Sequence, residues 1–465
     1  MSSLQALHDR FGRNVAFGLR VRTDGNADTL SKIISAISGG AASVGRVELL
    51  ETPADGLIYQ LQIFAASDAQ IEQVRSAVAG IADVSIVALL DLAMEAHRGG
   101  SCEMRSRMPI TSNTDLRVVY TPGVARVCKA IEAQPSKARE FTGVANKVAI
   151  ATNGTAILGL GDIGCLAGLP VMEGKSAIFW EFVKISAEPV LIDTHDADEF
   201  INIMEKLACG FGAIQVEDVA APECFRITRE LDRRLNIPVM HDDQHGTATV
   251  VMAGLFSALA KTGKKIGDIR CVMSGAGAAG TAIADLLMHE GVADVVLCDR
   301  TGAIYNGRKE GMNAEKVALA QRTNKEGFKG SLADAMKGRD LFIGVSQANI
   351  VSKEMVRSMA KDPIIFALAN PVSEISKPDA MSAGAAVYAD GRMMNNALAY
   401  PGIFRGLLDM QATMVTVEMV TAAARALARQ AGDNNLMPEM MDPATHQAVV
   451  QAVMSCPMRG EGLVK

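Results

Sequence analysis

A glycine-rich turn between two elements of regular structure most constrains the fold of this chain. It follows an apolar strand predicted over 269–274 and precedes a helix predicted to end near His289. A further strand over 294–298 ends in an acid, 19 residues after the turn's last glycine. Such glycines let the backbone approach a pyrophosphate at the helix N-terminus, and the acid binds ribose hydroxyls. The pattern predicts dinucleotide contacts at Gly275, Gly277, Ala279, Gly280 and Asp299.

The acid after the second strand bears on the choice of cofactor. Asp299 favours NAD, because a carboxylate accepts hydrogen bonds from free ribose hydroxyls. Three nearby cations, Arg300, Arg308 and Lys309, leave binding of the 2′-phosphate of NADP open. We therefore expect NAD(P) as the cofactor, with NAD favoured over NADP.

Two acidic pairs each follow a short apolar strand upstream of the glycine-rich turn. Glu217-Asp218 end the first predicted strand, and His241-Asp242-Asp243 end the second. Ligand sites of open α/β sheets lie beyond the carboxyl ends of strands, and Mg²⁺ and Mn²⁺ prefer oxygen ligands. A solvated loop is the common explanation for one isolated acidic pair. Two pairs after matching strands favour a metal site.

Four other positions carry side chains suited to catalysis or ligand binding. Tyr120 lies just before Pro122 at a predicted loop-to-helix junction, which can present a phenol to a cleft. Lys175 flanks an apolar segment, so desolvation could make it a base, although an isolated lysine is usually a surface charge. Asn370 and Asn396 could bind a substrate carboxylate or the nicotinamide amide, whereas turn formation is the more common role of a single asparagine.

The histidines and glycines near these positions have less specific explanations. His241 and His245 lie in an oxygen-rich set, and we expect them to support the ligands instead of binding the ion. Gly159, Gly161 and Gly164 fit a G-x-G-x-x-G pattern. For these glycines a close-packed turn near the site is at least as good an interpretation as a second nucleotide site.

Composition and patterning limit the classes of partner. The net charge of -6 is spread along the chain with no basic block, which argues against nucleic acid and anionic membranes. No apolar run reaches the roughly 18 residues of a membrane span, and the first residues lack a signal peptide's apolar centre. We expect a cytoplasmic protein. The eight cysteines have no Cys-x-x-Cys spacing and are interpreted as small buried apolar residues.

The N-terminal part of the chain combines alternating apolar residues with two helical repeats. These patterns predict the order βαββαβ, the ferredoxin-like arrangement. The segment resembles an ACT domain, a regulatory module that often binds an amino acid or related effector at an interface between copies. A dimerisation or packing domain without a ligand is an equally good interpretation, because only fold-level analogy supports a sensor.

The whole chain is predicted to be an α/β protein of several parts. We expect an ACT-like module over 1–92, a substrate and metal domain over 93–245, a doubly wound Rossmann-type NAD(P) domain over 246–410 and a helical C-terminal segment over 411–465. An apolar, amphipathic stretch in the C-terminal segment should pack on the body or on another subunit. The active site is expected in the cleft between the substrate and NAD(P) domains.

From about Asp115 to Asp409 the chain resembles a malic enzyme of the shorter bacterial type. Seven motifs occur in order: Tyr120-Thr121-Pro122-Gly123-Val124-Ala125, Leu158-Gly159-Leu160-Gly161-Asp162-Ile163-Gly164, Gly174-Lys175, Glu217-Asp218, His241-Asp242-Asp243-Gln244-His245-Gly246-Thr247, Ala369-Asn370-Pro371 and Asn395-Asn396. The resemblance implies oxidation and decarboxylation of L-malate to pyruvate and CO₂ with NAD(P) and Mg²⁺ or Mn²⁺. It implies Tyr120 as general acid, Lys175 as general base and Asp242 as the supporting acid. The implied metal ligands are Glu217, Asp218 and Asp243.

The resemblance leaves several points open. The larger malic enzymes carry a substrate-contacting arginine where this chain has Asn153-Gly154-Thr155-Ala156, so the groups that bind the malate carboxylates are undecided. An ACT-like module is present in only some members. A malolactic-type enzyme would share nearly every motif and give lactate, an amino-acid dehydrogenase would need no metal, and a catalytically silent sensor would rely on the ACT-like module. We also expect a homodimer or higher homo-oligomer, and an amino-acid or metabolite effector, if there is one, should bind at the ACT-like module.

Overall fold

The computed structural model describes residues 15–463 except residues 41, 55, 159 and 371. The chain divides into two compact units, one ending at Glu103 and the other beginning at Met104. In the described part of the chain, no helix is long and apolar enough to cross a membrane. All the candidate catalytic and cofactor residues belong to the second unit.

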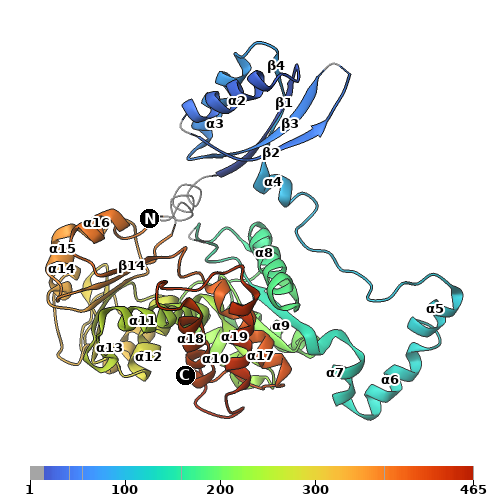
Figure 1. The fold of residues 1–465 in the computed structure, drawn as a ribbon. Coiled ribbons are helices and arrows are strands. Elements are labelled where there is room, and N and C mark those ends of the chain that lie inside the picture. The colour runs from blue at the N-terminus through green and yellow to red at the C-terminus, as the bar shows by residue number, and fades with distance from the viewer. Residues whose placement is uncertain (1–14, 41, 55, 159, 371, 464–465) are drawn as a thin grey trace. The chain divides into compact units, whose positions relative to one another are not determined.

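The first unit is an antiparallel sheet with two helices on one face (Figure 1). Its elements are β1 (Val15–Thr23), α2 (Ala27–Gly39), β2 (Ser43–Glu51), β3 (Leu57–Ala65), α3 (Asp68–Ala79), β4 (Val84–Asp91) and α4 (Leu92–Ala96). The strands lie in the order β2-β3-β1-β4. The fully buried side chains of Leu19, Ile33, Ile37, Leu61 and Val78 belong to its core. The order βαββαβ is the one predicted from the apolar alternation.

An extended arm, residues 104–141, begins the second unit. It contains α5 (Asn113–Val119), α6 (Val124–Ala133), η1 (Pro135–Lys137) and α7 (Ala138–Phe141), and η2 (Gly143–Asn146) leads from it into the first strand of the body. Figure 1 shows α5 and α6 standing away from both sheets of this unit. No residue of the arm is buried.

A four-stranded parallel sheet forms the first half of the body, with the order β6-β5-β7-β8. Its elements are β5 (Lys147–Thr152), α8 (Cys165–Val183), β6 (Ser186–Leu191), α9 (Ala197–Leu207), η3 (Ala208–Gly210), β7 (Ala213–Val216), α10 (Glu223–Arg234) and β8 (Val239–His241). Every residue of β7 and β8 is buried, as in parallel strands covered on both faces. Since Val216 pairs with His241, the two strands end at the same edge.

The second half of the body is a six-stranded sheet with the order β11-β10-β9-β12-β13-β14. Its elements are β9 (Arg270–Ser274), α12 (Ala278–His289), β10 (Asp294–Asp299), β11 (Gly302–Ala303), α13 (Ala314–Arg322), α14 (Leu332–Met336), β12 (Leu341–Gly344), α15 (Lys353–Arg357), β13 (Ile364–Ala367), α16 (Lys377–Ser382) and β14 (Val387–Asp390). Only β11 pairs antiparallel. Strand β10 lies on one side of β9 and β12 lies on the other, so the order of the strands reverses at β9. The crevice expected for a dinucleotide therefore lies between β9 and β12.

Helices that precede and follow the six-stranded sheet in the sequence pack the two sheets of the body together. They are η4 (Asp242–Gly246), α11 (Thr247–Thr262), η5 (Ile266–Asp268), η6 (Asn396–Leu398), α17 (Tyr400–Asp409), α18 (Val417–Ala431) and α19 (Pro443–Met454). Helix α18 packs on α11 and α19, and α17 packs on α8 and α19. The C-terminal helices therefore pack back on the body, one of the two outcomes predicted for the apolar stretch.

Candidate active site

Carboxylates from two neighbouring strands converge at one edge of the four-stranded sheet. Glu217 and Asp218 follow β7, and Asp242 and Asp243 begin η4 directly after β8. Oxygen atoms of Glu217, Asp218 and Asp243 all lie within 4.8 Å of one another. The Asp218 amide donates to Asp243 Oδ2 at 3.1 Å, which ties the two strand ends together. The structure thus brings together the three side chains predicted as metal ligands.

The chemistry of this group fits a hard divalent cation. Asp218 Oδ2 is buried without a hydrogen-bond partner. Burial, reinforced by Glu217 and Asp243, raises the pKa of Asp218 to about 8. Asp218 also has a φ of 50°, a left-handed conformation that non-glycine residues adopt at a cost and that occurs often at functional sites. A cation bound by these oxygens would relieve the repulsion between them.

Lys175 lies in the middle of α8 and projects into the same group, with its side chain only 13% exposed. Its Nζ is 2.9 Å from Glu217 Oε1 and also donates to Asp242 Oδ2. Burial disfavours the ammonium, but Asp242 and Glu217 outweigh it, and the pKa of Lys175 is raised well above its ordinary value. Burial alone therefore does not decide the protonation of Lys175, because the two carboxylates outweigh it. We call Lys175, Glu217, Asp218, Asp242 and Asp243 the carboxylate cage.

Asp242 holds Lys175 from the other side and is itself held by the cofactor half of the body. Asn396 Nδ2 donates to Asp242 Oδ2 at 2.6 Å. Asp242 is fully buried, and burial raises its pKa to about 7, with Lys175 opposing the shift. A Cβ at Gly246 would lie 2.0 Å from Asp242 Oδ1, so only glycine allows this close approach. The structure therefore places Asn396 against Asp242, an arrangement that the sequence did not predict.

His241 and His245 lie behind the cage and are uncharged. Burial lowers the pKa of each to about 3. His245 Nδ1 accepts from the His241 amide at 3.3 Å. Neither histidine is among the three residues whose oxygens lie close enough to share an ion, and their supporting role stays a prediction.

Tyr120 does not lie in the cage. It caps the C-terminus of α5 on the arm, and its side chain is 65% exposed. The phenol beside Lys175 is Tyr400, whose ring centroid is 4.8 Å from Lys175 Nζ. Tyr400 is fully buried, and its hydroxyl has no hydrogen-bond partner. Sequence reasoning gave Tyr400 no role, although its place four residues after Asn396 was a usable signal.

The segment that precedes α8 runs beside the metal group. Ala156 donates its amide to the backbone carbonyl of Asp218 at 3.0 Å. A Cβ at Gly154 would lie 2.2 Å from the backbone of Gly164, as in a tight turn. Gly159, part of the G-x-G-x-x-G pattern, lies outside the described residues. A Cβ at Gly161 or Gly164 would meet no atom within 4 Å, so the choice between a close-packed turn and a second nucleotide site stays open for this pattern.

The glycine-rich turn joins β9 to α12, as predicted. Gly275 has a φ of 112°, and a Cβ there would lie 2.6 Å from the Val345 carbonyl. A Cβ at Gly280 would lie 2.1 Å from the Gly275 carbonyl. Gly277 precedes α12 and Ala279 lies in its first turn, so their amides belong to a helix N-terminus that favours phosphate.

Asp299, at the end of β10, is engaged by two cations. Arg308 donates to its Oδ2, and Lys316 Nζ lies 2.7 Å from the same oxygen. Burial opposes ionisation, but these two donors outweigh it and lower the pKa of Asp299. Arg308 is therefore committed to the carboxylate, and Lys316 is a neighbour that sequence reasoning missed. Asn370 follows β13 at the same edge of the sheet and is exposed.

Comparison with known proteins decides the family. Residues 100–232 match the malic enzyme N-terminal domain, and residues 244–455 match the malic enzyme NAD binding domain. The chain belongs to the malic enzyme family. In this malic enzyme family member, Lys175 and Glu217 of the cage lie in the first matched segment, and Asn396, which donates to Asp242, lies in the second.

Relatives of this family member include proteins of different cofactor use and product. The bifunctional malic/malolactic enzyme of Bacillus subtilis is 46% identical over 384 residues, covering 80% of this chain and 94% of the relative. The NAD-dependent malic enzyme of Geobacillus stearothermophilus is 40% identical over 451 residues, covering 95% and 94%. The crystal structure of the NAD-dependent malic enzyme of Thermotoga maritima has a TM-score of 0.76 and 40% identity, covering 78% of this chain and 99% of that one.

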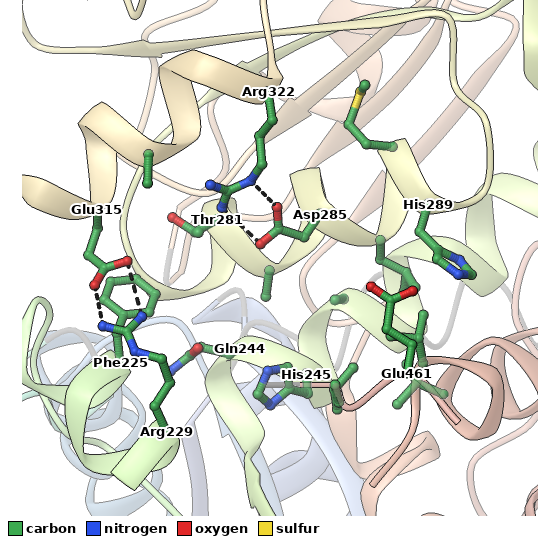
Figure 2. A pocket seen from close by; sticks show the side chains of 18 residues that line it. Phe225, Arg229, Gln244, His245, Thr281, Asp285, His289, Glu315, Arg322 and Glu461 are labelled. Carbon is green, nitrogen blue, oxygen red and sulfur yellow. Dashed lines mark hydrogen bonds and ion pairs between the residues drawn. The ribbon is translucent and has the colours of Figure 1, made fainter. Parts of the chain in front are cut away.

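A cavity of about 540 Å³ lies elsewhere in the body, between α10, η4, α12, α13 and α18 (Figure 2). Two ion pairs border it, Arg229 with Glu315 and Arg322 with Asp285. Its lining includes Gln244 but none of the residues of the carboxylate cage. The cavity is therefore distinct from the carboxylate cage.

Proposed function

We propose that this chain catalyses the metal-dependent oxidative decarboxylation of L-malate to pyruvate and CO₂, with reduction of NAD(P). The observation that carries the proposal is the contact of a buried lysine with Glu217 and Asp242 beside a three-carboxylate group suited to a divalent cation. The glycine-rich turn before α12 supports the cofactor half of the reaction. The family and the names of its relatives agree with this activity.

Lys175 would accept the proton of the malate C2 hydroxyl as hydride leaves C2. For this it must be neutral, and the charges of Glu217 and Asp242 oppose that state in the cage. We expect Lys175 to become a base when Glu217, Asp218 and Asp243 are engaged as metal ligands, since their charge then stabilises the ammonium less. Asp242, bonded to both Lys175 and Asn396, orients the amine.

The cation held by Glu217, Asp218 and Asp243 would polarise the C2 oxygen and stabilise the charge left on it when CO₂ departs. Tyr120 would then return a proton to C3 and give pyruvate, the role implied by its motif. A general acid must come within hydrogen-bond reach of the atom that it protonates. Because Tyr120 is exposed on the arm, it can protonate C3 only if the arm is placed so that the phenol reaches the substrate.

NAD is the favoured cofactor in this proposal, and NADP is the alternative. Asp299 remains ionised and can accept a ribose hydroxyl in addition to its two cations. NAD-dependent relatives at 40% identity support the preference. Arg308 and Lys316 carry two positive charges against the one negative charge of Asp299. This net positive charge would allow the 2′-phosphate of NADP to bind.

A malolactic activity is the second candidate, favoured by one comparison. The relative at 46% identity is a bifunctional malic/malolactic enzyme. Such a chain would keep the same cage and reduce the bound pyruvate to lactate with the NADH that it had formed. Product analysis separates the two activities.

The first unit is proposed to be an ACT-like regulatory module that binds an amino acid or related effector. Its βαββαβ order and antiparallel sheet support the assignment. We further propose a cytoplasmic homo-oligomer. Titration calorimetry of the full chain with each amino acid would test the effector, and uniformly absent heats would contradict it.

The activity itself is tested by mixing purified protein with L-malate and Mn²⁺, with NAD and NADP in separate reactions. We expect EDTA-sensitive formation of NADH, with pyruvate in equal amount. Lactate without net NADH would favour the malolactic candidate. Absence of turnover with both cofactors would contradict the proposal.

A further inference from the structure

Two loops of the cofactor sheet border the dinucleotide crevice on the side opposite Asp299. One begins after Gly344, the last residue of β12, and the other begins after Ala367, the last residue of β13. Because Gly344 pairs with Ala367 in parallel strands, both loops start at the same edge of the sheet. A dinucleotide lies across such a crevice with one nucleotide on each side, and Asp299, after β10, marks the adenosine side. The two loops therefore border the nicotinamide side.

A buried carboxylate joins these two loops. Glu374 belongs to the loop after β13, and its side chain is fully buried. Its Oε1 accepts from the Ser346 amide at 3.1 Å, and its Oε2 accepts from the Ala369 amide at 3.1 Å. Each oxygen thus holds the backbone of a different loop. Hydrogen bonds to an ionised acceptor are stronger than bonds between neutral groups, so the connection is a firm one.

The chemistry of this connection suits a carboxylate. Burial raises the pKa of Glu374, and the bonds from the Ser346 and Ala369 amides oppose that shift. A buried carboxylate costs free energy unless hydrogen bonds compensate for the lost water. Two amide donors need two acceptor atoms, which a carboxylate has, whereas a glutamine side chain has one acceptor and one donor. Glutamate is therefore the side chain that can hold both loops at once.

Strand β12 leaves space for the carboxylate. A Cβ at Gly344 would lie 2.2 Å from Glu374 Cδ and 2.4 Å from Glu374 Oε1. Alanine at this position would therefore displace the carboxylate from the two amides. The glycine at the end of β12 and the glutamate after β13 form one structural unit.

The contacts of this unit extend to both sides of the crevice. Ser346 Oγ lies 2.7 Å from the Oγ of Ser274, the last residue of β9. On the other side, Ala369 is followed directly by Asn370, which is predicted to bind the nicotinamide amide or a substrate carboxylate. Holding the Ala369 amide therefore restricts the backbone that carries Asn370.

We propose that Glu374 is a positioning residue for the nicotinamide end of the cofactor, holding the loops of Ser346 and Ala369 at the separation that the ring and its amide require. This inference rests on the proposed function, to which it adds one residue. Because Glu374 is fully buried, it acts through the two loops and not by contact with the cofactor. The adenosine side, bordered by the glycine-rich turn and Asp299, does not depend on it.

The test compares two ligands by titration calorimetry of the full chain: NAD⁺, and ADP-ribose, which lacks the nicotinamide ring. Glu374→Gln keeps the size of the side chain but turns one acceptor into a donor that faces an amide N–H. We expect the Kd of NAD⁺ to rise about tenfold, the effect of losing one hydrogen bond to a charged group, and the Kd of ADP-ribose to stay within about twofold. Unchanged NAD⁺ binding, or an equal loss for both ligands, would overturn the proposal.

The matched control is Glu290→Gln in the same half of the body. Glu290 caps the C-terminus of α12 and pairs with Arg425, away from the loops after β12 and β13. The same substitution there should leave both dissociation constants unchanged. A selective loss of NAD⁺ binding in this control would show that the effect is not specific to Glu374 and would overturn the proposal.

A second variant keeps the charge of Glu374 and decides the case if Glu374→Gln does not fold. Gly344→Ala displaces the carboxylate, and we expect the same selective loss of NAD⁺ binding. Thermal denaturation verifies that each variant is folded, and wild-type affinity for NAD⁺ in folded Gly344→Ala would contradict the proposal. None of these measurements uses malate. A wild-type chain inactive on malate would contradict the proposed function, and the two dissociation constants would still decide the role of Glu374.

Discussion

The carboxylate cage and the arm differ in how their functional side chains are held. In the cage, Lys175 is fixed by Glu217 and Asp242, and Asp242 is fixed by Asn396. On the arm, Tyr120 is exposed. Groups that hold one another are preorganised within one chain, whereas an exposed catalytic group needs a covering surface before its position is defined. The effect of a substitution in the cage should therefore depend on contacts already present in the chain, whereas the effect of a substitution at Tyr120 should depend on how the arm is covered.

The largest effect is expected in the cage. Lys175→Ala removes the proposed base and should lower malate oxidation by about 10⁴-fold, the upper end of general-base effects. NAD binding should be unchanged, because the glycine-rich turn belongs to the other sheet. NADH formation and a fluorescence titration with NADH measure the two quantities. Normal turnover in this variant would eliminate Lys175 as the base.

The next effect should come from the arm. Tyr120→Phe should lower pyruvate formation by about 10²-fold and hydride transfer by less, since the phenol acts after C2 is oxidised. Comparing NADH with pyruvate shortly after mixing separates the two steps, and we expect an early excess of NADH that is balanced by enolpyruvate not yet protonated at C3. Equal loss of both products would place Tyr120 at an earlier step or in binding alone.

A smaller effect concerns the stability of the cage. The pKa of Asp218 is about 8 in the folded chain against an ordinary 3.8, so the folded state binds the proton more tightly. Its contribution to stability is present below about pH 4 and is lost as the pH rises toward 8. Without metal, the melting temperature should fall across this range.

Stabilisation by Mn²⁺ should grow across the same range, since ligands must be deprotonated to bind the ion. Thermal denaturation with and without Mn²⁺ at several pH values measures both trends. Asp218→Asn serves as the control, and it should weaken the pH trend and the Mn²⁺ shift together. A Mn²⁺ shift of equal size in that variant would remove Asp218 from the metal site.

The smallest effect is expected for the phenol that is already beside Lys175. Tyr400→Phe removes a buried hydroxyl without a partner, an arrangement that costs about 1–3 kcal/mol, so stability should be equal or higher. Pyruvate formation should stay within about threefold of wild type. A loss of about 10²-fold would instead make Tyr400 the proton donor.

Much of the fold follows from local patterns in the sequence. The apolar runs of β9 and β10 predict two strands, and the glycine-rich turn after β9 follows a backbone path that side chains at these glycines would block. The acidic residues after β7 and β8 were predicted to meet because parallel strands share an edge, and the structure places them there. These features depend on residues close in sequence or on a general rule of sheet topology.

The remaining features depend on contacts between distant segments. The bond between Asn396 and Asp242 joins residues far apart in the chain, and nothing in either motif specifies it. The raised pKa of Lys175 depends on the sum of several charges around a buried amine, which burial alone does not indicate. The exposure of Tyr120 depends on how the arm as a whole is placed, and the sequence pattern around Tyr120 does not specify that placement.

The hydrogen bond between Asn396 and Asp242 also has a consequence for the timing of turnover. Asn396 follows the last strand of the cofactor sheet, and Asp242 follows the last strand of the metal sheet. A hinge motion that separated the two sheets would break this 2.6 Å bond. Asp242 would then lose one of the two groups that fix it, and we predict that the amine of Lys175 would be less well oriented while the site is open. Opening of the site and loss of an aligned base would in that case coincide.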